Sequence, residues 1–165
     1  MAGVDWRQLS ILVVEDNRYM VALITTILRS AGSRDIRTAF NGEGALELLK
    51  QRPVDVTLLD ILMEGMDGIG FTLAVRRDPA SIDPFLPIVA VTGCSDVVTI
   101  RRTIDAGVNA VVLKPLAPKT LLTHVARVLL APRPFVRTKS FFGPNRRRPA
   151  VGPFKGQERR RPVAS

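Results

Sequence analysis

The chain has 165 residues and a net charge of +9 at neutral pH, with 46% apolar and 24% charged residues. This composition is that of a globular protein and excludes disorder of the whole chain. The single cysteine, Cys94, excludes a disulfide framework and a cysteine-based zinc site. No apolar run approaches the roughly 20 residues that cross a membrane, and the first residues lack a secretion-signal pattern, so we expect a cytoplasmic protein.

The positive charge is confined to the C-terminal segment. Residues 1–130 contain 14 Lys and Arg and 14 Asp and Glu, whereas residues 131–165 contain 10 basic residues and one acid. This division predicts a neutral folded domain over 1–130 and a basic tail over 131–165.

Short apolar runs alternate with amphipathic segments through the first 130 residues. Runs rich in Val, Ile and Leu predict strands, and apolar residues spaced three and four apart predict helices. Strands are expected at 9–15, 35–39, 54–60, 87–92 and 109–114, and helices at 17–32, 41–52, 67–77, 96–106 and 118–130. This order predicts an α/β fold in which a doubly wound, five-stranded parallel sheet is covered by helices on both faces.

Polar side chains stand where the expected strands end. Glu15 and Asp16 follow the first strand, Asp60 ends the third, Thr92 ends the fourth and Lys114 ends the fifth. The carboxyl ends of parallel strands meet at one edge of the sheet, where ligands bind. We therefore expect three acids, a hydroxyl group and an ammonium group in one crevice.

This set of residues fits a site that accepts a phosphoryl group. Three neighbouring carboxylates repel one another and favour a hard divalent cation such as Mg²⁺. Asp60 is the expected nucleophile, because a carboxylate can form an aspartyl phosphate. Thr92 can donate a hydrogen bond to the phosphoryl oxygens, and Lys114 can supply positive charge. Phosphoryl transfer to Asp60 and slow hydrolysis of the product are the only chemistry expected, so the sequence does not predict a true enzyme.

The segments ILVVEDN, VDVTLLDILMEGMDG, VAVTG and VVLKP resemble the receiver domain of two-component response regulators, the CheY-like fold. The resemblance covers about residues 8–130. It implies that a histidine kinase phosphorylates Asp60 and that Thr92 and Lys114 contact the phosphoryl group. The implied Mg²⁺ ligands are Glu15, Asp16, Asp60 and the backbone carbonyl of Leu62.

Two positions depart from the family pattern. Val111, three residues before Lys114, stands where the family usually has Phe or Tyr, whose ring reports phosphorylation to the output face. Valine has no such ring, so this relay is absent or replaced. Glu64 stands where the family commonly has proline. The absence of proline here is expected to loosen the loop after Asp60.

The basic tail contains a repeat. FFGPNRRRP at 141–149 aligns with FKGQERRRP at 154–162, so the pattern F-x-G-x-[NE]-R-R-R-P recurs after 13 residues. The tail has six prolines and no helical or strand period, so we expect it to be disordered without a ligand. Arginine outnumbers lysine eight to two there. Because guanidinium pairs with phosphate and with the O6 and N7 atoms of guanine, this bias favours a guanine-plus-phosphate ligand.

A receiver with such an extension resembles the CheY-like cyclic di-GMP effectors, single-domain regulators of flagellated bacteria that act at the flagellar motor. The spacing of Arg133 and Arg137 is similar to the R-x-x-x-R element of PilZ domains. The resemblance implies cyclic di-GMP as ligand, a flagellar switch protein as partner, and recruitment to the motor or the cell pole. The implied ligand contacts are Arg133, Arg137, Phe142, Gly143, Asn145, Arg146, Arg147, Arg148, Gly156, Glu158, Arg159, Arg160 and Arg161.

The sequence leaves two other functions open. One is a regulator driven only by a histidine kinase, with the tail as an electrostatic anchor for an acidic partner, a membrane surface or nucleic acid. The intact Asp60, Thr92 and Lys114 favour this function, and Val111 weakens it. The other is nucleic-acid binding, which the charge would permit. No helix-turn-helix motif follows the receiver segment, so sequence-specific transcriptional control is not expected, and the sequence does not favour nucleic acid as a partner.

Overall fold

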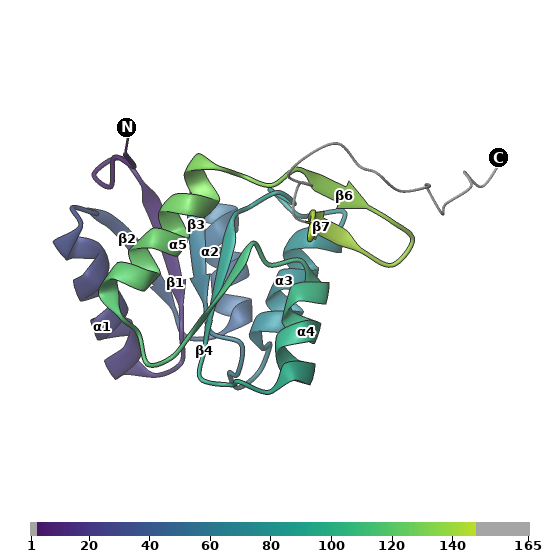
Figure 1. The fold of residues 1–165 in the computed structure, drawn as a ribbon, viewed down its shortest axis with the longest axis horizontal. Helices are drawn as coiled ribbons and strands as arrows, with labels where there is room; N and C mark the ends of the chain where they lie inside the picture. Colours follow the sequence, from purple (N-terminus) through teal and green to yellow (C-terminus); the bar gives the residue numbers. More distant parts are fainter. Residues whose placement is uncertain (1–2, 148–165) are drawn as a thin grey trace, which may run out of the picture.

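Five parallel strands form a sheet at the centre of the molecule (Figure 1). The computed structural model describes residues 3–147, and the order of strands in this sheet is β2-β1-β3-β4-β5. The strands are β1 (Ser10–Val14), β2 (Asp35–Ala39), β3 (Val56–Leu59), β4 (Ile88–Thr92) and β5 (Ala110–Leu113). The strand order extends first to one side of β1 and then to the other, which confirms the predicted doubly wound α/β fold.

Five helices connect and follow these strands. They are α1 (Arg18–Ser30), α2 (Gly42–Gln51), α3 (Gly68–Arg77), α4 (Val97–Ala106) and α5 (Pro118–Leu130). Four of them begin after a side chain that accepts a hydrogen bond from a first-turn backbone N–H, namely Asn17, Asn41, Asp67 and Asp96. These caps satisfy donors that the helix itself leaves without partners. Within residues 3–147, no helix combines the length and the apolar character needed to span a bilayer.

The central sheet is buried on both faces. Helices α1 and α5 cover the face to which Ile11 and Val13 contribute, and α2 and α3 cover the face to which Leu12 and Val14 contribute (Figure 1). Successive side chains of a strand point to opposite faces. A strand covered on both sides is therefore apolar at nearly every position, which explains the unbroken apolar runs in the sequence.

The residues after α5 form a second sheet of two strands. β6 (Phe135–Arg137) and β7 (Phe142–Pro144) pair antiparallel, and the Asn145 amide donates to the Pro134 carbonyl at 2.8 Å. We call residues 135–144 the hairpin. The prediction that the tail lacks regular structure is wrong for these residues. Three-residue strands are too short to produce a period in the sequence, and their Gly and Pro favour a loop assignment.

Aromatic contacts hold the hairpin against the domain. The ring centroids of Phe135 and Phe142 lie 5.0 and 5.4 Å from that of Phe85, in the segment before β4, and 5.4 Å from each other. The guanidinium of Arg76, near the end of α3, lies 5.0 Å from the Phe135 ring. Aromatic pairs and cation–π contacts of this kind add stability beyond the burial of apolar area. The hairpin is thus attached to the domain by side chains from distant parts of the sequence.

Arg76 is the polar centre of this junction. It is only 1% exposed, and it donates to the backbone oxygens of Gly107 (3.0 Å) and Pro84 (2.9 Å) and to Asn109 Oδ1 (3.0 Å). Burial lowers the pKa of Arg76 to about 10, so the side chain stays charged at neutral pH. Three acceptors on one planar guanidinium compensate for the removal of that charge from water.

Two glycines let the hairpin backbone approach the domain closely. Gly107 ends α4 with φ of +112°, and a Cβ on it would lie 2.7 Å from the Phe142 carbonyl oxygen. A Cβ on Gly143 would lie 2.8 Å from the Cα of Gly107. Because Phe85 and Gly107 precede β4 and β5, the hairpin lies near the amino ends of these strands, away from the edge where the carboxyl ends meet (Figure 1).

Candidate functional site

The carboxyl ends of β1 and β3 bring three acids together. Sheet hydrogen bonds continue past the strand ends, since the Glu15 amide donates to the Ala39 carbonyl at 3.0 Å and the Asp60 amide to the Val14 carbonyl at 2.8 Å. Carboxylate oxygens of Glu15, Asp16 and Asp60 all lie within 4.8 Å of one another. Glu15 and Asp60 are buried, and Asp16 is exposed. The acids that the sequence places at the ends of two different strands therefore form one cluster.

Lys114 connects this cluster to β5. Its Nζ lies 2.9 Å from Glu15 Oε2 and 3.6 Å from Asp60 Oδ2. Burial raises the pKa of the Glu15 carboxyl above its ordinary value, while hydrogen bonds from Lys114 and from the Asn17 amide act in the opposite direction. The cluster thus holds more acids than bases, which favours the binding of a further cation.

The backbone around Asp60 fixes the orientation of its carboxylate. Oδ1 accepts a hydrogen bond from the Ile61 amide at 2.8 Å, and Oδ2 faces Lys114. A Cβ on Gly68, the first residue of α3, would lie 2.3 Å from the Asp60 carbonyl oxygen. Glycine at this position lets the start of α3 pack directly on the strand end that carries Asp60. In the sequence, the only signal for this role of Gly68 is its place directly after the helix cap Asp67.

Thr92 and Lys114 come from the neighbouring strands β4 and β5. The Lys114 amide donates to the Thr92 carbonyl at 2.9 Å, which continues the ladder between the two strands. Thr92 is buried, and its Oγ1 accepts a hydrogen bond from the Cys94 amide at 3.1 Å. The hydroxyl proton can therefore be donated to a ligand oxygen. The peptide bond between Lys114 and Pro115 is cis.

The acid cluster fits Mg²⁺. Glu15, Asp16 and Asp60 offer hard oxygen donors, and the exposed Asp16 opens the cluster to solvent. A cation of this kind prefers oxygen ligands and keeps several of its waters. Leu62, two residues after Asp60, has a side chain that is 59% exposed, and the role of its carbonyl group stays a prediction.

The predicted cyclic di-GMP contacts in the hairpin and directly after it fall into two groups. Phe142 and Gly143 are buried and pack against Phe85 and Gly107. In this arrangement they anchor the hairpin, and the Phe142 ring does not lie open for a base to stack on it. The residue pattern F-x-G therefore has a structural role in this copy of the repeat.

The arginines of the hairpin region are instead on the surface. The guanidinium carbons of Arg137 and Arg146 lie 4.1 Å from the ring centroids of Phe142 and Phe141. Arg146 also forms an ion pair with Asp105 of α4. Stacking on a ring and pairing with an acid restrict these planar groups while leaving them exposed.

The remaining predicted contacts are only partly described. Arg133 and Arg147 are exposed, and Asn145 Oδ1 accepts a hydrogen bond from the Arg147 amide at 3.0 Å. Outside the described residues lie Arg148, Gly156, Glu158, Arg159, Arg160 and Arg161.

Two residues that the sequence analysis did not count among the ligand contacts lie near these arginines. His124 and Arg127 of α5 line the same cavity as Arg133 and Arg146. They are three residues apart on a helix and so share one face. This spacing is the signal in the sequence that His124 and Arg127 lie together. The sequence does not indicate that the residues after α5 fold back beside this face of the helix.

The sequence matches the family described as response regulator receiver domain over residues 11–126. The DNA-binding response regulator MtrA of Mycolicibacterium smegmatis is 31% identical over 121 residues, which cover 73% of this chain and 50% of MtrA. The probable transcriptional regulator ycf27 of Guillardia theta is 33% identical over 119 residues, which cover 72% of this chain and 44% of that protein. The chain thus spans about half the length of the curated relatives it matches.

Solved structures agree with this family match. A putative response regulator from Chloroflexus aurantiacus J-10-fl has a TM-score of 0.69 and 30% identity, covering 74% of this chain and 98% of its own. The chemotaxis protein CheY4 of Vibrio cholerae has a TM-score of 0.66 and 29% identity, covering 73% and 98% of the two chains. With its strand order, the acids after β1 and β3 and the lysine after β5, this chain belongs to the response regulator receiver family and has the CheY-like fold.

Proposed function

We propose that this chain is a response regulator that accepts a phosphoryl group on Asp60, binds cyclic di-GMP through its arginine-rich C-terminal segment, and acts by docking to a protein of the flagellar motor. The observation that carries the proposal is the ordered hairpin. The hairpin and the residues directly after it present Arg137 and Arg146 as exposed, stacked guanidinium groups beside the receiver domain.

The acid cluster supports the phosphoryl-accepting step. In that step an Asp60 oxygen bonds to phosphorus, the bond from phosphorus to the phosphohistidine nitrogen of a kinase breaks, and its electron pair returns to the imidazole. Lys114 lies where it can pair with a phosphoryl oxygen, and Thr92 can donate a hydrogen bond. Bound by Glu15, Asp16 and Asp60, Mg²⁺ would supply positive charge that neutralises the transferring group.

The chemistry of arginine supports cyclic di-GMP as the ligand of the C-terminal segment. Each guanidinium can pair with a phosphate through two hydrogen bonds, contact the O6 and N7 atoms of guanine, or stack on a base. Guanidinium groups that already stack on Phe141 and Phe142 lose less conformational freedom on binding than unrestrained side chains. The second copy of the repeat, at 154–162, supplies a further set of arginines.

Exposed apolar side chains support an output by protein docking. Val97 and Val98 at the start of α4 are 74% and 65% exposed, and Leu113 at the end of β5 is 46% exposed. Leu113 directly precedes Lys114, so this exposed side chain is one residue away from the phosphoryl site. Exposed apolar side chains of this kind suit a protein interface.

Titration calorimetry with the full chain tests the ligand assignment. We expect cyclic di-GMP to bind at physiological salt, and GTP and a short RNA to bind much more weakly. Arg137→Ala should weaken binding by about tenfold, the effect of losing one charge-assisted contact. Lys139→Ala is the matched control, because Lys139 is an exposed cation in the turn of the same hairpin. Equal binding of all polyanions, or equal effects of the two variants, would contradict the proposal.

A regulator driven by phosphorylation alone is the second candidate. The contact of Lys114 with both Glu15 and Asp60 favours it, since the parts of a phosphoryl-accepting site are present whatever the tail binds. In that case the basic segment is an electrostatic anchor for an acidic partner. A chain that accepts phosphate on Asp60 but shows no cyclic di-GMP binding would support this function.

A further inference from the structure

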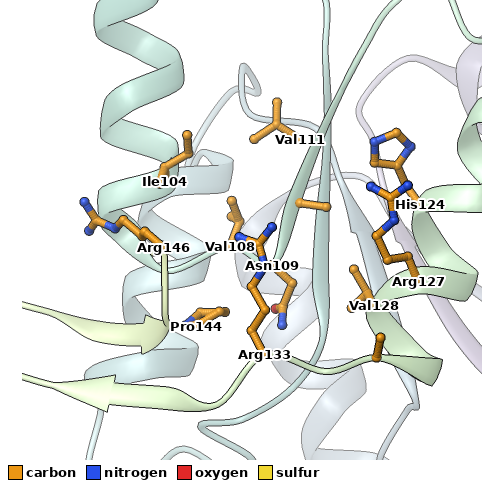
Figure 2. Close-up of a pocket in the computed structure, with 12 residues that line it drawn as sticks. Ile104, Val108, Asn109, Val111, His124, Arg127, Val128, Arg133, Pro144 and Arg146 are labelled. Carbon is orange, nitrogen blue, oxygen red and sulfur yellow. The ribbon is translucent and has the colours of Figure 1, made fainter. Parts of the chain in front are cut away.

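A cavity of about 450 Å³ lies between the hairpin, α4, β5 and α5 (Figure 2). Val111 of β5 lines the cavity at the top of this view, and His124, Arg127 and Val128 of α5 form one side. The other side comes from α4 and from the segment that includes the hairpin. A volume of this size lies within the range of small-molecule sites.

The walls of the cavity combine an apolar surface with positive charge. Ile104, Val108, Val111 and Val128 provide apolar side chains. The charged groups are Arg127, Arg133 and Arg146, and among the described residues that line the cavity none is acidic. An apolar wall suits a flat ring, and the guanidinium groups suit an anion attached to it.

Figure 2 shows how the arginines are arranged. Arg133 extends from the segment before the hairpin across the cavity toward Val111, and Arg127 lies beside His124 on α5. Arg146 points away from the centre, toward α4, where it pairs with Asp105. Within residues 3–147, neither Arg127 nor Arg133 forms an ion pair. Both guanidinium groups are therefore available to a ligand.

The small side chain of Val111 helps to leave this space open. Val111 is half-buried and packs against the core with one part of its surface. A phenylalanine at this position would extend into the cavity from the face of the sheet opposite to α5, on the side of Val108 and Ile104. The size of the side chain at position 111 therefore determines how much of the cavity is open.

We propose that the cavity binds one guanine nucleotide unit of cyclic di-GMP. The ring lies on the apolar side chains of Val108, Val111 and Val128, while Arg127 and Arg133 donate to the guanine O6 and N7 atoms and to the adjoining phosphate. This inference rests on the proposed function and gives its ligand a place in the fold. It adds Arg127 and the valines of the receiver domain to a site assigned above only to the C-terminal segment.

The site also has a consequence for signalling. β5 is only four residues long, from Ala110 to Leu113, and Lys114 follows it directly. A ligand against Val111 therefore contacts the strand that positions Lys114 beside Asp60. Any coupling between ligand binding and phosphorylation is reciprocal, so each would change the affinity of the other by the same factor.

Calorimetry on the full chain with cyclic di-GMP tests the site through two variants with matched controls. Val111→Phe fills the cavity, whereas Val98→Phe adds the same ring to an exposed position on α4. Arg127→Gln removes a cavity cation, whereas Arg101→Gln removes an exposed cation of α4. We expect each cavity variant to weaken binding by about tenfold or more and each control to stay within about twofold. Thermal unfolding establishes that Val111→Phe still folds.

Three results separate the possible outcomes. Cyclic di-GMP binding that is unchanged in Val111→Phe and Arg127→Gln would overturn the cavity site and leave the proposed function intact. No binding by the unaltered chain would overturn both. Cyclic di-AMP, which carries adenine in place of guanine, is a second probe: binding weakened by about tenfold supports base recognition, and equal binding overturns it.

Discussion

The groups around the two ends of β5 have opposite net charge, acidic at the carboxyl end and basic at the amino end. Different forces position the charged groups at each end. At the carboxyl end, Lys114 lies among Glu15 and Asp60, whose backbones continue the hydrogen-bond ladders of the sheet. At the amino end, the arginines come from α5 and from the region of the hairpin, which aromatic rings and Arg76 hold in place. The first group is fixed by the fold itself, and the second by a junction of side chains.

This difference predicts different sensitivities to mutation. Backbone hydrogen bonds at the end of a buried sheet break only when the domain unfolds. Within residues 3–147, β6 and β7 pair with each other and not with the central sheet. The hairpin can therefore detach while the sheet stays folded, because stability is not uniform across a structure. Perturbing one end of β5 should therefore leave the other end largely intact.

The largest expected effect is chemical and confined to the acid cluster. Asp60→Asn keeps the shape of the side chain but removes the carboxylate that we propose attacks phosphorus, so we expect complete loss of phosphoryl acceptance from a small acyl phosphate donor. Glu47→Gln, which removes an exposed acid of α2, should leave labelling unchanged. Intact-mass spectrometry with Mg²⁺ present measures the phosphorylated fraction. Persistent labelling of Asp60→Asn would place the phosphoacceptor elsewhere.

The second effect concerns the hairpin alone. Phe142→Ala removes a buried ring that contacts Phe85 and Phe135, which should cost about 3 kcal/mol of hairpin docking. Hydrogen exchange should then accelerate at the Asn145 amide, which bonds to Pro134 across the hairpin, but not at the Asp60 amide within the sheet.

Phe141→Ala is the matched control for this prediction. Phe141 is the adjacent ring, it is only half-buried, and it supports Arg146 rather than the aromatic junction. We expect its effect on exchange to be smaller. Equal acceleration at Asn145 and Asp60 in Phe142→Ala would show that the hairpin and the sheet unfold together, which would remove the distinction between the two ends.

The same distinction explains what the sequence could predict. Glu15, Asp60, Thr92 and Lys114 each end a recognisable apolar strand, and a parallel sheet collects such ends at one edge. The site therefore follows from the order of elements. The buried position of Glu15 and its contact with Lys114 needed the structure, because they depend on side-chain packing.

The hairpin could not be predicted by this reasoning. Its docking depends on Phe85, Arg76 and Gly107, which lie far from it in the sequence and carry no periodic signal. The F-x-G pattern was visible, but the sequence alone gave it a ligand-binding interpretation. In the structure Phe142 is buried and Gly143 meets Gly107, so the same residues provide attachment. The composition shows the excess of arginine. It does not indicate the face of the domain on which the arginine side chains lie.

The smallest expected effect is on the free energy of unfolding, which the buried acid cluster lowers. Burial raises the pKa of Glu15 in the folded state above its ordinary value of 4.5. Between the pKa of the unfolded chain and that of the folded chain, the folded state therefore binds more protons than the unfolded state. The free energy of unfolding therefore falls as pH rises through this window, and above it the charged carboxylate remains destabilising. Without divalent cations, we expect Glu15→Gln to be more stable than the unaltered chain at pH 7, with the gap narrowing as pH falls through the window.

Mg²⁺ should reverse this order. A ligand that binds only the folded state adds about 2.7 kcal/mol at one hundred times its Kd, and Glu15→Gln should gain less because it lacks one of the carboxylates. Urea unfolding at several pH values, with and without Mg²⁺, measures both effects, and Glu47→Gln again serves as the control. If Mg²⁺ stabilises Glu15→Gln as much as the unaltered chain, Glu15 is not a ligand, and its buried charge is compensated by Lys114 alone. If it stabilises only the unaltered chain, the excess of acid at the carboxyl end of β5 serves to bind the cation, just as the excess of arginine at the amino end is proposed to bind an anion.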